Sequence, residues 1–457
     1  MYRFALDYLK EWKNRLSRKP LVIRGARQVG KTYLIREFAK EFDTYIEINL
    51  ETDQTIIPYF EKDDPIQALR LLELHYNKKI IKESTLLFLD EIQAAPKIFA
   101  KLRYFYEKVP ELYIVAACSL LEFVIEEHYF SMPVGRIEYM HLGPMSFQEF
   151  LIANENAKVA KFLSHYSVED DFPIPLHTKL LELFKIYLTI GGMPESINSY
   201  TLQKSYQECD RIKANILTTY IDDFGKYGRR VNYQRTLLVF KAIPGSVGKK
   251  FKYVHISREQ RAKDLATSLH MLSLARICYK VHHSSCQGIP LGALTDMKIF
   301  KLLFLDVGLL LSACGLSMLH VEKADNLLLV NAGSICEQFI GQHLLYRQEY
   351  YREPELHYWI REKSGSNAEI DYVVASGEHI VPIEVKAGKA GSLKSLHMFV
   401  SSRRLPLAVR TNTDIPSLVR SKGKMPTGTA YDYHLLSIPC YMIEHVDRLV
   451  NEAYSSF

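Results

Sequence analysis

The chain contains no long apolar run and no closely spaced pair of cysteines. Its longest apolar runs, such as Leu86–Leu89 and Ile114–Cys118, are far shorter than the roughly 20 residues that a membrane span requires. The seven cysteines are scattered without any CxxC pair, which argues against a disulfide framework and against a zinc site. The first residues, Met1–Asp7, are interrupted by charges and lack the apolar core of a secretion signal. We therefore expect a cytoplasmic protein that does not associate with a membrane.

The chain also lacks a large excess of charge of one sign. It has 58 Lys and Arg residues against 52 Asp and Glu residues, which gives a formal net charge of +6. This balance permits a polyanionic partner such as DNA but does not require one. A length of 457 residues, of which 47 % are hydrophobic, is enough for about three domains that each bury a core.

A phosphate-binding pattern lies near the N-terminus. The apolar run Leu21–Ile23 leads into eight residues of the form GxxxxGK[ST], namely Gly25, Ala26, Arg27, Gln28, Val29, Gly30, Lys31 and Thr32. The glycines allow consecutive backbone N–H groups to point at a triphosphate, Lys31 reaches the β- and γ-phosphates, and the Thr32 hydroxyl can hold Mg²⁺. A helix is expected to begin at Lys31 and to aim its positive end at the phosphates. The pattern therefore predicts that ATP or ADP binds here with Mg²⁺, with Tyr33 at the margin of the site.

Two carboxylates follow a second apolar run, at residues 85–90. Continuous apolar runs of this kind are typical of buried strands in a parallel sheet. Asp90, at the carboxyl end of the run, is predicted to bind Mg²⁺ through water, and Glu91 to orient and deprotonate the attacking water. Ser119 ends another buried strand and is predicted to lie beside the γ-phosphate. A simple helix cap at Ser119 remains an alternative.

These motifs, together with Gln93, Gly135, Arg136 and the run Leu142–Phe147, resemble those of prokaryotic AAA-type ATPases that carry a C-terminal DUF4143 domain. That family is similar to the STAND-like signalling ATPases. The resemblance implies a five-stranded parallel sheet with the nucleotide at the carboxyl ends of its strands. It also implies that Gln93 positions the water or senses the γ-phosphate, and that Arg136 is a sensor or intersubunit arginine.

The same resemblance gives a role to a Gly-Met-Pro element in the helical region that follows. It implies that Gly192 and Pro194 contact the adenine. A helix that ends at glycine and restarts after proline explains these residues equally well, so both interpretations stay open.

The predicted fold is α/β, in four parts. They are an ATPase core at 1–155, a helical lid at 156–230, a winged-helix domain that resembles DUF4143 at 231–330, and an α/β domain at 331–457. The winged helix is predicted from two helices followed by strands at 275–281 and 298–306. Basic residues at 249–263 could place it on DNA, although such modules also dock proteins.

The last part resembles the core of PD-(D/E)xK nucleases. Alternation along a strand puts Glu384 and Lys386 on one face, across a hairpin from Asp371. Asp371 and Glu384 are predicted to share a Mg²⁺ ion, Lys386 to lower the pKa of the attacking water, and Glu337 to orient that water or add a ligand. An edge hairpin with charges on its solvent face is the alternative.

These observations together predict an ATP-hydrolysing nucleotide switch for a winged-helix and nuclease-like module that acts on DNA, with a second copy of the chain among its candidate partners. The alternative is a slow ATP- or ADP-dependent signalling or scaffold protein whose degenerate tail binds a protein partner.

Overall fold

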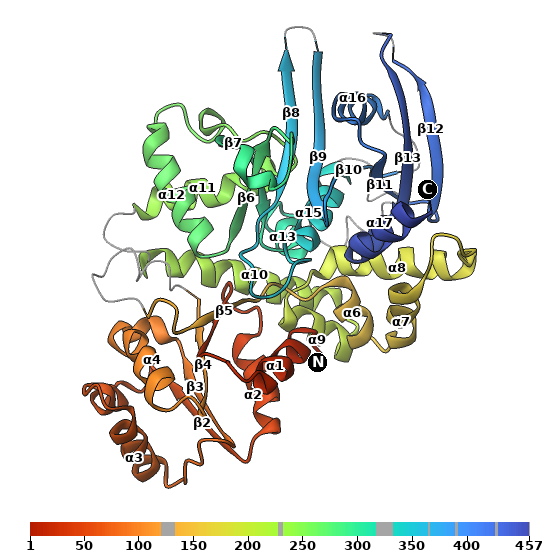
Figure 1. Ribbon diagram of the computed structural model, residues 1–457. Helices are drawn as coiled ribbons and strands as arrows, with labels where there is room; N and C mark the ends of the chain where they lie inside the picture. The colour runs from red at the N-terminus through yellow and green to blue at the C-terminus, as the bar shows by residue number, and fades with distance from the viewer. Residues whose placement is uncertain are drawn as a thin grey trace.

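The computed structural model describes residues 1–119, 133–226, 232–316, 332–363, 366–388, 392–425 and 428–456. Two β-sheets organise these residues, one in the N-terminal third of the chain and one in its second half (Figure 1). Helices of the middle of the chain lie between the two sheets. The predicted domain boundaries at 230/231 and 330/331 fall outside the described residues.

The first sheet has five parallel strands in the order β2-β3-β4-β1-β5. The strands are β1 (Leu21–Arg24), β2 (Thr44–Asn49), β3 (Thr85–Asp90), β4 (Tyr113–Cys118) and β5 (Glu138–His141). Alternate residues of β1 enter two different hydrophobic cores: Leu21 and Ile23 lie in one, and Val22 in the other. Both faces of the sheet are therefore covered, and the predicted parallel sheet is confirmed.

Four helices cover these faces. They are α1 (Ala5–Asn14), α2 (Lys31–Phe38), α3 (Pro65–Tyr76) and α4 (Pro96–Lys108). The buried residues of α1 and α2 share one core, and those of α3 and α4 share the other. The carboxyl ends of the parallel strands are left free to carry loops.

A run of helices follows the first sheet. It comprises α6 (Phe147–Ala153), α7 (Ala157–His165), α8 (Ile174–Ile190), α9 (Pro194–Gln203), α10 (Tyr206–Asp223), α11 (Tyr233–Ala242) and α12 (Ala262–Leu274). Gly191 has a left-handed φ of 77° and separates α8 from α9 at the predicted break. Pro194, the first residue of α9, lies against Gly30 at the first sheet, and α10 packs against α9 and α13 (Val307–Ala313).

The second sheet has eight strands of mixed direction, in the order β12-β13-β11-β10-β9-β8-β6-β7. The strands are β6 (Cys278–Ser284), β7 (Thr295–Phe304), β8 (His357–Lys363), β9 (Ser366–Ser376), β10 (His379–Val385), β11 (Leu407–Asn412), β12 (Ser417–Lys424) and β13 (Ala430–Pro439). The helices of this half are α13, α15 (Ala332–Leu345), α16 (Lys394–Arg403) and α17 (Val446–Ser455).

The hairpin of β6 and β7 does not form a separate winged-helix domain. The two predicted helices and the hairpin are present, but His282 and His283 of β6 pair in parallel with His357 and Tyr358 of β8. The hairpin therefore extends the sheet of the C-terminal part. Local pattern predicted the hairpin but could not predict this pairing, because the partner strand lies more than 70 residues further along the chain.

Among the described residues, no helix combines the length and the apolar character that crossing a bilayer requires.

Phe339 of α15 lies where the helical region meets the second sheet. Its ring is fully buried and its centroid lies 4.7 Å from that of Phe184 and 5.6 Å from that of Tyr187. Phe147, at the start of α6, contacts the same cluster. This aromatic cluster joins the two halves of the molecule.

We expect Phe339→Ala to lower the free energy of unfolding by about 3–5 kcal/mol, because it leaves a cavity in a closely packed cluster. Denaturant unfolding followed by fluorescence measures the change. Leu202→Ala, at a site 74 % exposed, is the control and should stay within about 0.5 kcal/mol of the wild type. Equal effects of the two substitutions would contradict this account of the junction.

Candidate functional site

The glycine-rich loop (residues 25–32) has the backbone that its sequence requires. Gln28 and Gly30 have left-handed φ values of 65° and 91°. A Cβ at Gly25 would lie 2.3 Å from the carbonyl oxygen of Leu142, so only glycine fits there. The loop connects β1 to α2, as predicted, at the carboxyl edge of the first sheet.

Lys31, Thr32 and Asp90 meet at this edge. The Thr32 hydroxyl donates a 2.9 Å hydrogen bond to Oδ2 of Asp90. The Lys31 ammonium is buried and donates to the carbonyl oxygens of Gly25 at 3.0 Å and Ala26 at 2.8 Å. Burial lowers the pKa of Lys31, although the charges of Glu91 and Asp90 oppose this. Burial likewise raises the pKa of Asp90, and the Thr32 hydrogen bond opposes that shift.

Glu91 gathers the other polar groups predicted for this site. Its Oε2 accepts a 3.2 Å hydrogen bond from the Ser119 hydroxyl and another from Nε2 of Gln93. Glu91 has a left-handed φ of 51°, a conformation that costs a residue with a Cβ about 1–2 kcal/mol. Such strain is often found where a side chain is held in a functional position. The structure thus brings Glu91, Gln93 and Ser119 together.

Arg3 secures the loop from its other side. Its guanidinium donates to the carbonyl oxygens of Val29 and Gly143, at 2.9 Å each, and pairs with Glu149 at 3.0 Å. The side chains of Arg3 and Glu149 are only 6 % and 4 % exposed. Sequence reasoning missed this residue, because a single arginine before an amphipathic helix carries no motif.

Helices α9 and α10 approach the loop from the helical region. A Cβ on Gly30 would lie 3.3 Å from Cγ of Pro194, so Pro194 lies directly against the loop. At the end of α10, the Tyr220 hydroxyl donates to the carbonyl oxygen of Arg27 at 2.8 Å, and Asp223 pairs with the Arg27 guanidinium at 2.8 Å. These contacts tie the loop to the helical region.

Gly192 forms hydrogen bonds within the protein through its backbone. Its N–H donates to Asp306 at 2.6 Å, and its carbonyl oxygen accepts from the N–H of Met145 at 2.7 Å. Both backbone groups of Gly192 are therefore already engaged within the protein, so a hydrogen bond from them to an adenine would have to replace these partners, and the adenine contact stays a prediction. A contact from Pro194 stays a prediction.

Two other predicted residues lie away from the loop's centre. Tyr33 is 43 % exposed and its hydroxyl contacts the amine of Met1. Arg136 precedes β5 and pairs on the surface with Glu107 at 3.1 Å. Since β5 runs parallel to β1, Arg136 lies at the opposite edge of the sheet, which is incompatible with a sensor role in its own chain's site. A role between subunits stays a prediction.

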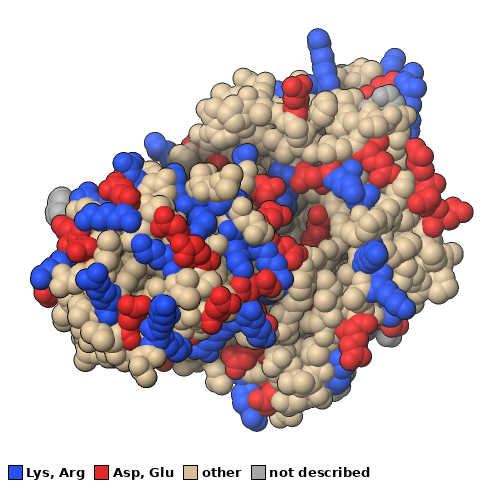
Figure 2. Space-filling view, turned by 60° about the horizontal axis from the view of Figure 1, so that its bottom comes forward, with Lys and Arg blue, Asp and Glu red and all other residues tan. Residues whose placement is uncertain are grey.

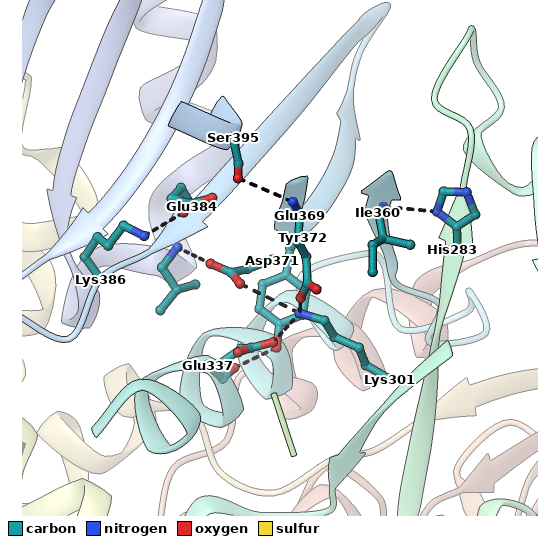
Figure 3. Close-up of polar contacts among 11 residues, drawn as sticks. His283, Lys301, Glu337, Ile360, Glu369, Asp371, Tyr372, Glu384, Lys386 and Ser395 are labelled. Carbon is teal, nitrogen blue, oxygen red and sulfur yellow. Dashed lines mark hydrogen bonds and ion pairs between the residues drawn. The ribbon is translucent and has the colours of Figure 1, made fainter. Parts of the chain in front are cut away.

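A second polar site lies on the second sheet. Glu337 of α15 and Glu369 and Asp371 of β9 form an acidic cluster, in which one oxygen of each lies within 4.8 Å of the others. Lys301 of β7 enters this cluster: its Nζ is 2.8 Å from Glu337 and 3.7 Å from Asp371, and it also pairs with Glu369 (Figure 3). Burial raises the pKa of Glu337 to about 7, and Lys301 opposes the shift.

Glu384 and Lys386 lie beside the acidic cluster. The Lys386 ammonium pairs with Oε1 of Glu384 at 2.6 Å, as expected for two residues on one face of the strand. Both carboxylate oxygens of Asp371 face other groups. Its Oδ2 accepts from the N–H of Val385 at 2.7 Å, and its Oδ1 faces Lys301. Burial, with the charge of Asp371, raises the pKa of Glu384 to about 7.

A metal ion shared by Asp371 and Glu384 stays a prediction, and Glu337, Glu369 and Asp371 form a further group of carboxylates close enough to hold an ion. Sequence reasoning missed Glu369 and Lys301. Glu369 lies two residues before Asp371, so strand alternation could have placed it on the same face. No local signal could have identified Lys301, since it reaches the cluster from β7.

We expect Arg3→Ala to lower the free energy of unfolding by about 3–5 kcal/mol, because it leaves Glu149 buried without its cation. Denaturant unfolding measures the loss. Lys10→Ala removes an exposed pair with Glu41 and is the control, for which we expect a loss of no more than about 1 kcal/mol. A small loss for Arg3→Ala would show that the pair does not stabilise the loop.

Three family models match the sequence. The AAA_14 model, described as an AAA domain, matches residues 17–151. Two domains of unknown function follow: DUF8612 at residues 181–320 and DUF4143 at residues 332–441. The DUF4143 match thus lies further along the chain than the 231–330 stretch for which the resemblance was predicted. No curated protein matches the sequence.

Several solved structures resemble the chain weakly. PCH-2 of C. elegans is 11 % identical with a TM-score of 0.26, and the match covers 42 % of this chain and 59 % of PCH-2. The ORC2 protein of Aeropyrum pernix, in ADPNP–ADP complexes, is 13 % identical with a TM-score of 0.34, covering 69 % and 93 %. AMPPCP-bound DnaA of Aquifex aeolicus is 16 % identical with a TM-score of 0.24, covering 59 % and 86 %.

Each candidate site lies within one of the matched regions: the glycine-rich loop, Asp90 and Glu91 fall in the first match, and Glu337, Asp371 and Glu384 fall in the last. The chain therefore carries an AAA domain of the AAA_14 family at residues 17–151 and a DUF4143 domain at residues 332–441.

Proposed function

We propose that the AAA domain binds ATP with Mg²⁺ and hydrolyses it. The observation that carries this proposal is the 2.9 Å hydrogen bond between Thr32 and Asp90, at the carboxyl edge of the sheet and next to Lys31. A hydroxyl and a carboxylate are the hard oxygen ligands that Mg²⁺ prefers. Thr32 and Asp90 would hold the ion, which supplies charge stabilisation to the phosphates.

The remaining residues of this site fit the hydrolysis step. Lys31 now donates to two loop carbonyls, and the phosphates of ATP would replace these acceptors. Glu91 is the general base for the attacking water, and Ser119 and Gln93 orient its carboxylate. In-line attack on the γ-phosphate requires positioning and charge stabilisation more than covalent chemistry, and these side chains supply both.

We further propose that hydrolysis acts as a switch for the second sheet. Pro194 lies against Gly30 of the loop, and two residues earlier the N–H of Gly192 donates to Asp306. Asp306 lies two residues after the end of β7 and caps α13 by accepting from the N–H of Leu309 at 3.0 Å. A shift of the loop on loss of the γ-phosphate would therefore reach β7 through two buried contacts.

The target of the switch is, in this proposal, a nuclease-like tail that acts on DNA. The acidic cluster of Glu337, Glu369 and Asp371 supports this proposal, and Glu384 lies beside it, paired with Lys386. Figure 2 shows the lower face of the molecule, where basic and acidic side chains are interspersed and no large basic patch is seen.

One observation favours the second candidate, a scaffold whose tail binds a protein partner. Lys301 pairs with the carboxylates that a metal-dependent nuclease would use for its metal. A tail in which this contact never opens would be a binding platform under nucleotide control.

We expect Lys31→Ala to abolish ATP binding and Glu91→Gln to keep binding but lower kcat about 10²- to 10⁴-fold, since only the general base is lost. A fluorescent ATP analogue and a phosphate-release assay measure the two effects separately. Lys40→Ala, at an exposed position that pairs with Glu37, is the control and should match the wild type. ATP turnover that is unchanged in Glu91→Gln would refute the assigned role.

We expect Mg²⁺-dependent cleavage of DNA in the presence of ATP, and its loss in Lys386→Ala with ATP turnover intact. Single- and double-stranded DNA are assayed with and without ATP. Lys424→Ala, an exposed lysine on β12, is the control for lost surface charge. If every protein leaves all substrates intact while it hydrolyses ATP, the nuclease proposal fails and the scaffold takes its place.

A further inference from the structure

Lys301 places a cation inside the acidic cluster of Glu337, Glu369 and Asp371. Its side chain is 2 % exposed, and its Nζ contacts a carboxylate oxygen of all three residues. In Figure 3 the ammonium lies among the three carboxylates, at the end of a side chain that comes from a different strand. Oxygens within 4.8 Å of one another are close enough for a single cation to bridge.

The lysine is fixed in this position by its surroundings. Its backbone pairs with Val281 of β6 and, from the other side, with Lys250. Its Nζ lies 5.1 Å from the ring centroid of Tyr358. A Cβ on Gly248 would lie 2.8 Å from Oε2 of Glu337, so the chain at Gly248 covers the cluster closely. The position of the Lys301 side chain is therefore fixed by the strand pairing and by the residues packed around it.

The three carboxylates of the cluster stabilise the charge of Lys301. Burial alone would lower the pKa of Lys301, but the charges of Glu337, Asp371 and Glu369 outweigh burial and raise it above its ordinary value. The ammonium is therefore held as a cation at all ordinary pH values. A divalent ion in the same place would meet both a positive charge and occupied carboxylate oxygens.

Glu384, beside the acidic cluster, has a carboxylate oxygen that Lys301 does not contact. Glu384 is 6 % exposed, and its Oε2 has no hydrogen-bond partner among the described residues. Figure 3 shows the Glu384 carboxylate beside that of Asp371, on the side away from Lys301. A buried carboxylate oxygen without a partner is costly unless a cation or a water molecule binds to it.

We infer that Lys301 is the resident cation of the acidic cluster and that it closes the cluster to divalent metal ions. Mg²⁺ or Mn²⁺ binds there only when the ammonium has been withdrawn or removed. The inference rests on the proposed function, because it gives the nuclease-like tail a closed state. It also assigns the switch a physical task, since β7 carries Lys301 and ends two residues before Asp306.

The test is Mn²⁺ binding to the full-length protein without nucleotide, measured from the loss of the free Mn²⁺ signal in electron paramagnetic resonance. We expect Lys301→Met to bind one more Mn²⁺ per chain than the wild type. The double variant Lys301→Met with Asp371→Asn should lose this additional ion. Lys280→Met is the matched control, because Lys280 is a partly buried lysine on the adjacent strand β6 that lies outside the acidic cluster.

Thermal unfolding provides a second readout. Mn²⁺ should raise the Tm of Lys301→Met by more than that of the wild type, because only the variant has an open cluster that gains stability from the ion, whereas the Thr32–Asp90 site is the same in both. If Lys301→Met does not fold, the wild type is compared with Asp371→Asn instead. Mn²⁺ binding by the wild type that is lost in Asp371→Asn would overturn the inference. Equal Mn²⁺ binding by the two proteins supports a closed cluster. A folded Lys301→Met that binds no additional Mn²⁺ also overturns it. Neither result depends on DNA cleavage or ATP turnover, so the inference and the proposed function fail separately.

Discussion

The buried carboxylate of Asp306 is the interaction on which the arrangement of the two halves depends. It accepts hydrogen bonds from Gly192, behind the glycine-rich loop, and from Leu309, at the start of α13. A Cβ on Gly191 would lie 2.2 Å from Asp306 Oδ1 and 2.9 Å from Cα of Gly308, so the two chain segments touch backbone to backbone. A buried charge needs such donors, and their geometry leaves the segments little freedom to separate. The position of the helical region relative to the second sheet is therefore fixed at this contact.

In each candidate site, the lysine already has a hydrogen-bonding or ion-pairing partner within the protein. Lys31 donates to carbonyl oxygens of its loop, and Lys301 pairs with the acidic cluster. In each case a ligand has to compete with this internal partner. Binding would therefore shift an equilibrium between two states, one with the lysine paired within the protein and one with the lysine released. The two lysines lie on opposite sides of the contact made by Asp306. Bistable polar groups joined by a rigid connection are the physical elements that a switch requires.

The sequence predicted the elements that depend on local pattern. The glycine-rich loop, the parallel sheet, the Asp90–Glu91 motif and the hairpin of Asp371 and Glu384 all lie where they were expected. It could not predict contacts that the fold creates between distant segments. Arg3 reaches Glu149, and Lys301 reaches Glu337, only after the chain has folded. The hydrogen bonds of Gly192 to Met145 and Asp306 were equally out of reach, because these partners are far away in sequence.

The parallel pairing of β6 with β8 has a consequence for inheritance. β6 lies in the DUF8612 match and β8 in the DUF4143 match, yet they are neighbours in a single sheet. A recombination event between the two matched regions would leave one unpaired sheet edge on each product, and exposed edges of this kind promote aggregation. We therefore expect the DUF8612 and DUF4143 regions to be inherited together as one unit, although two separate family models match them.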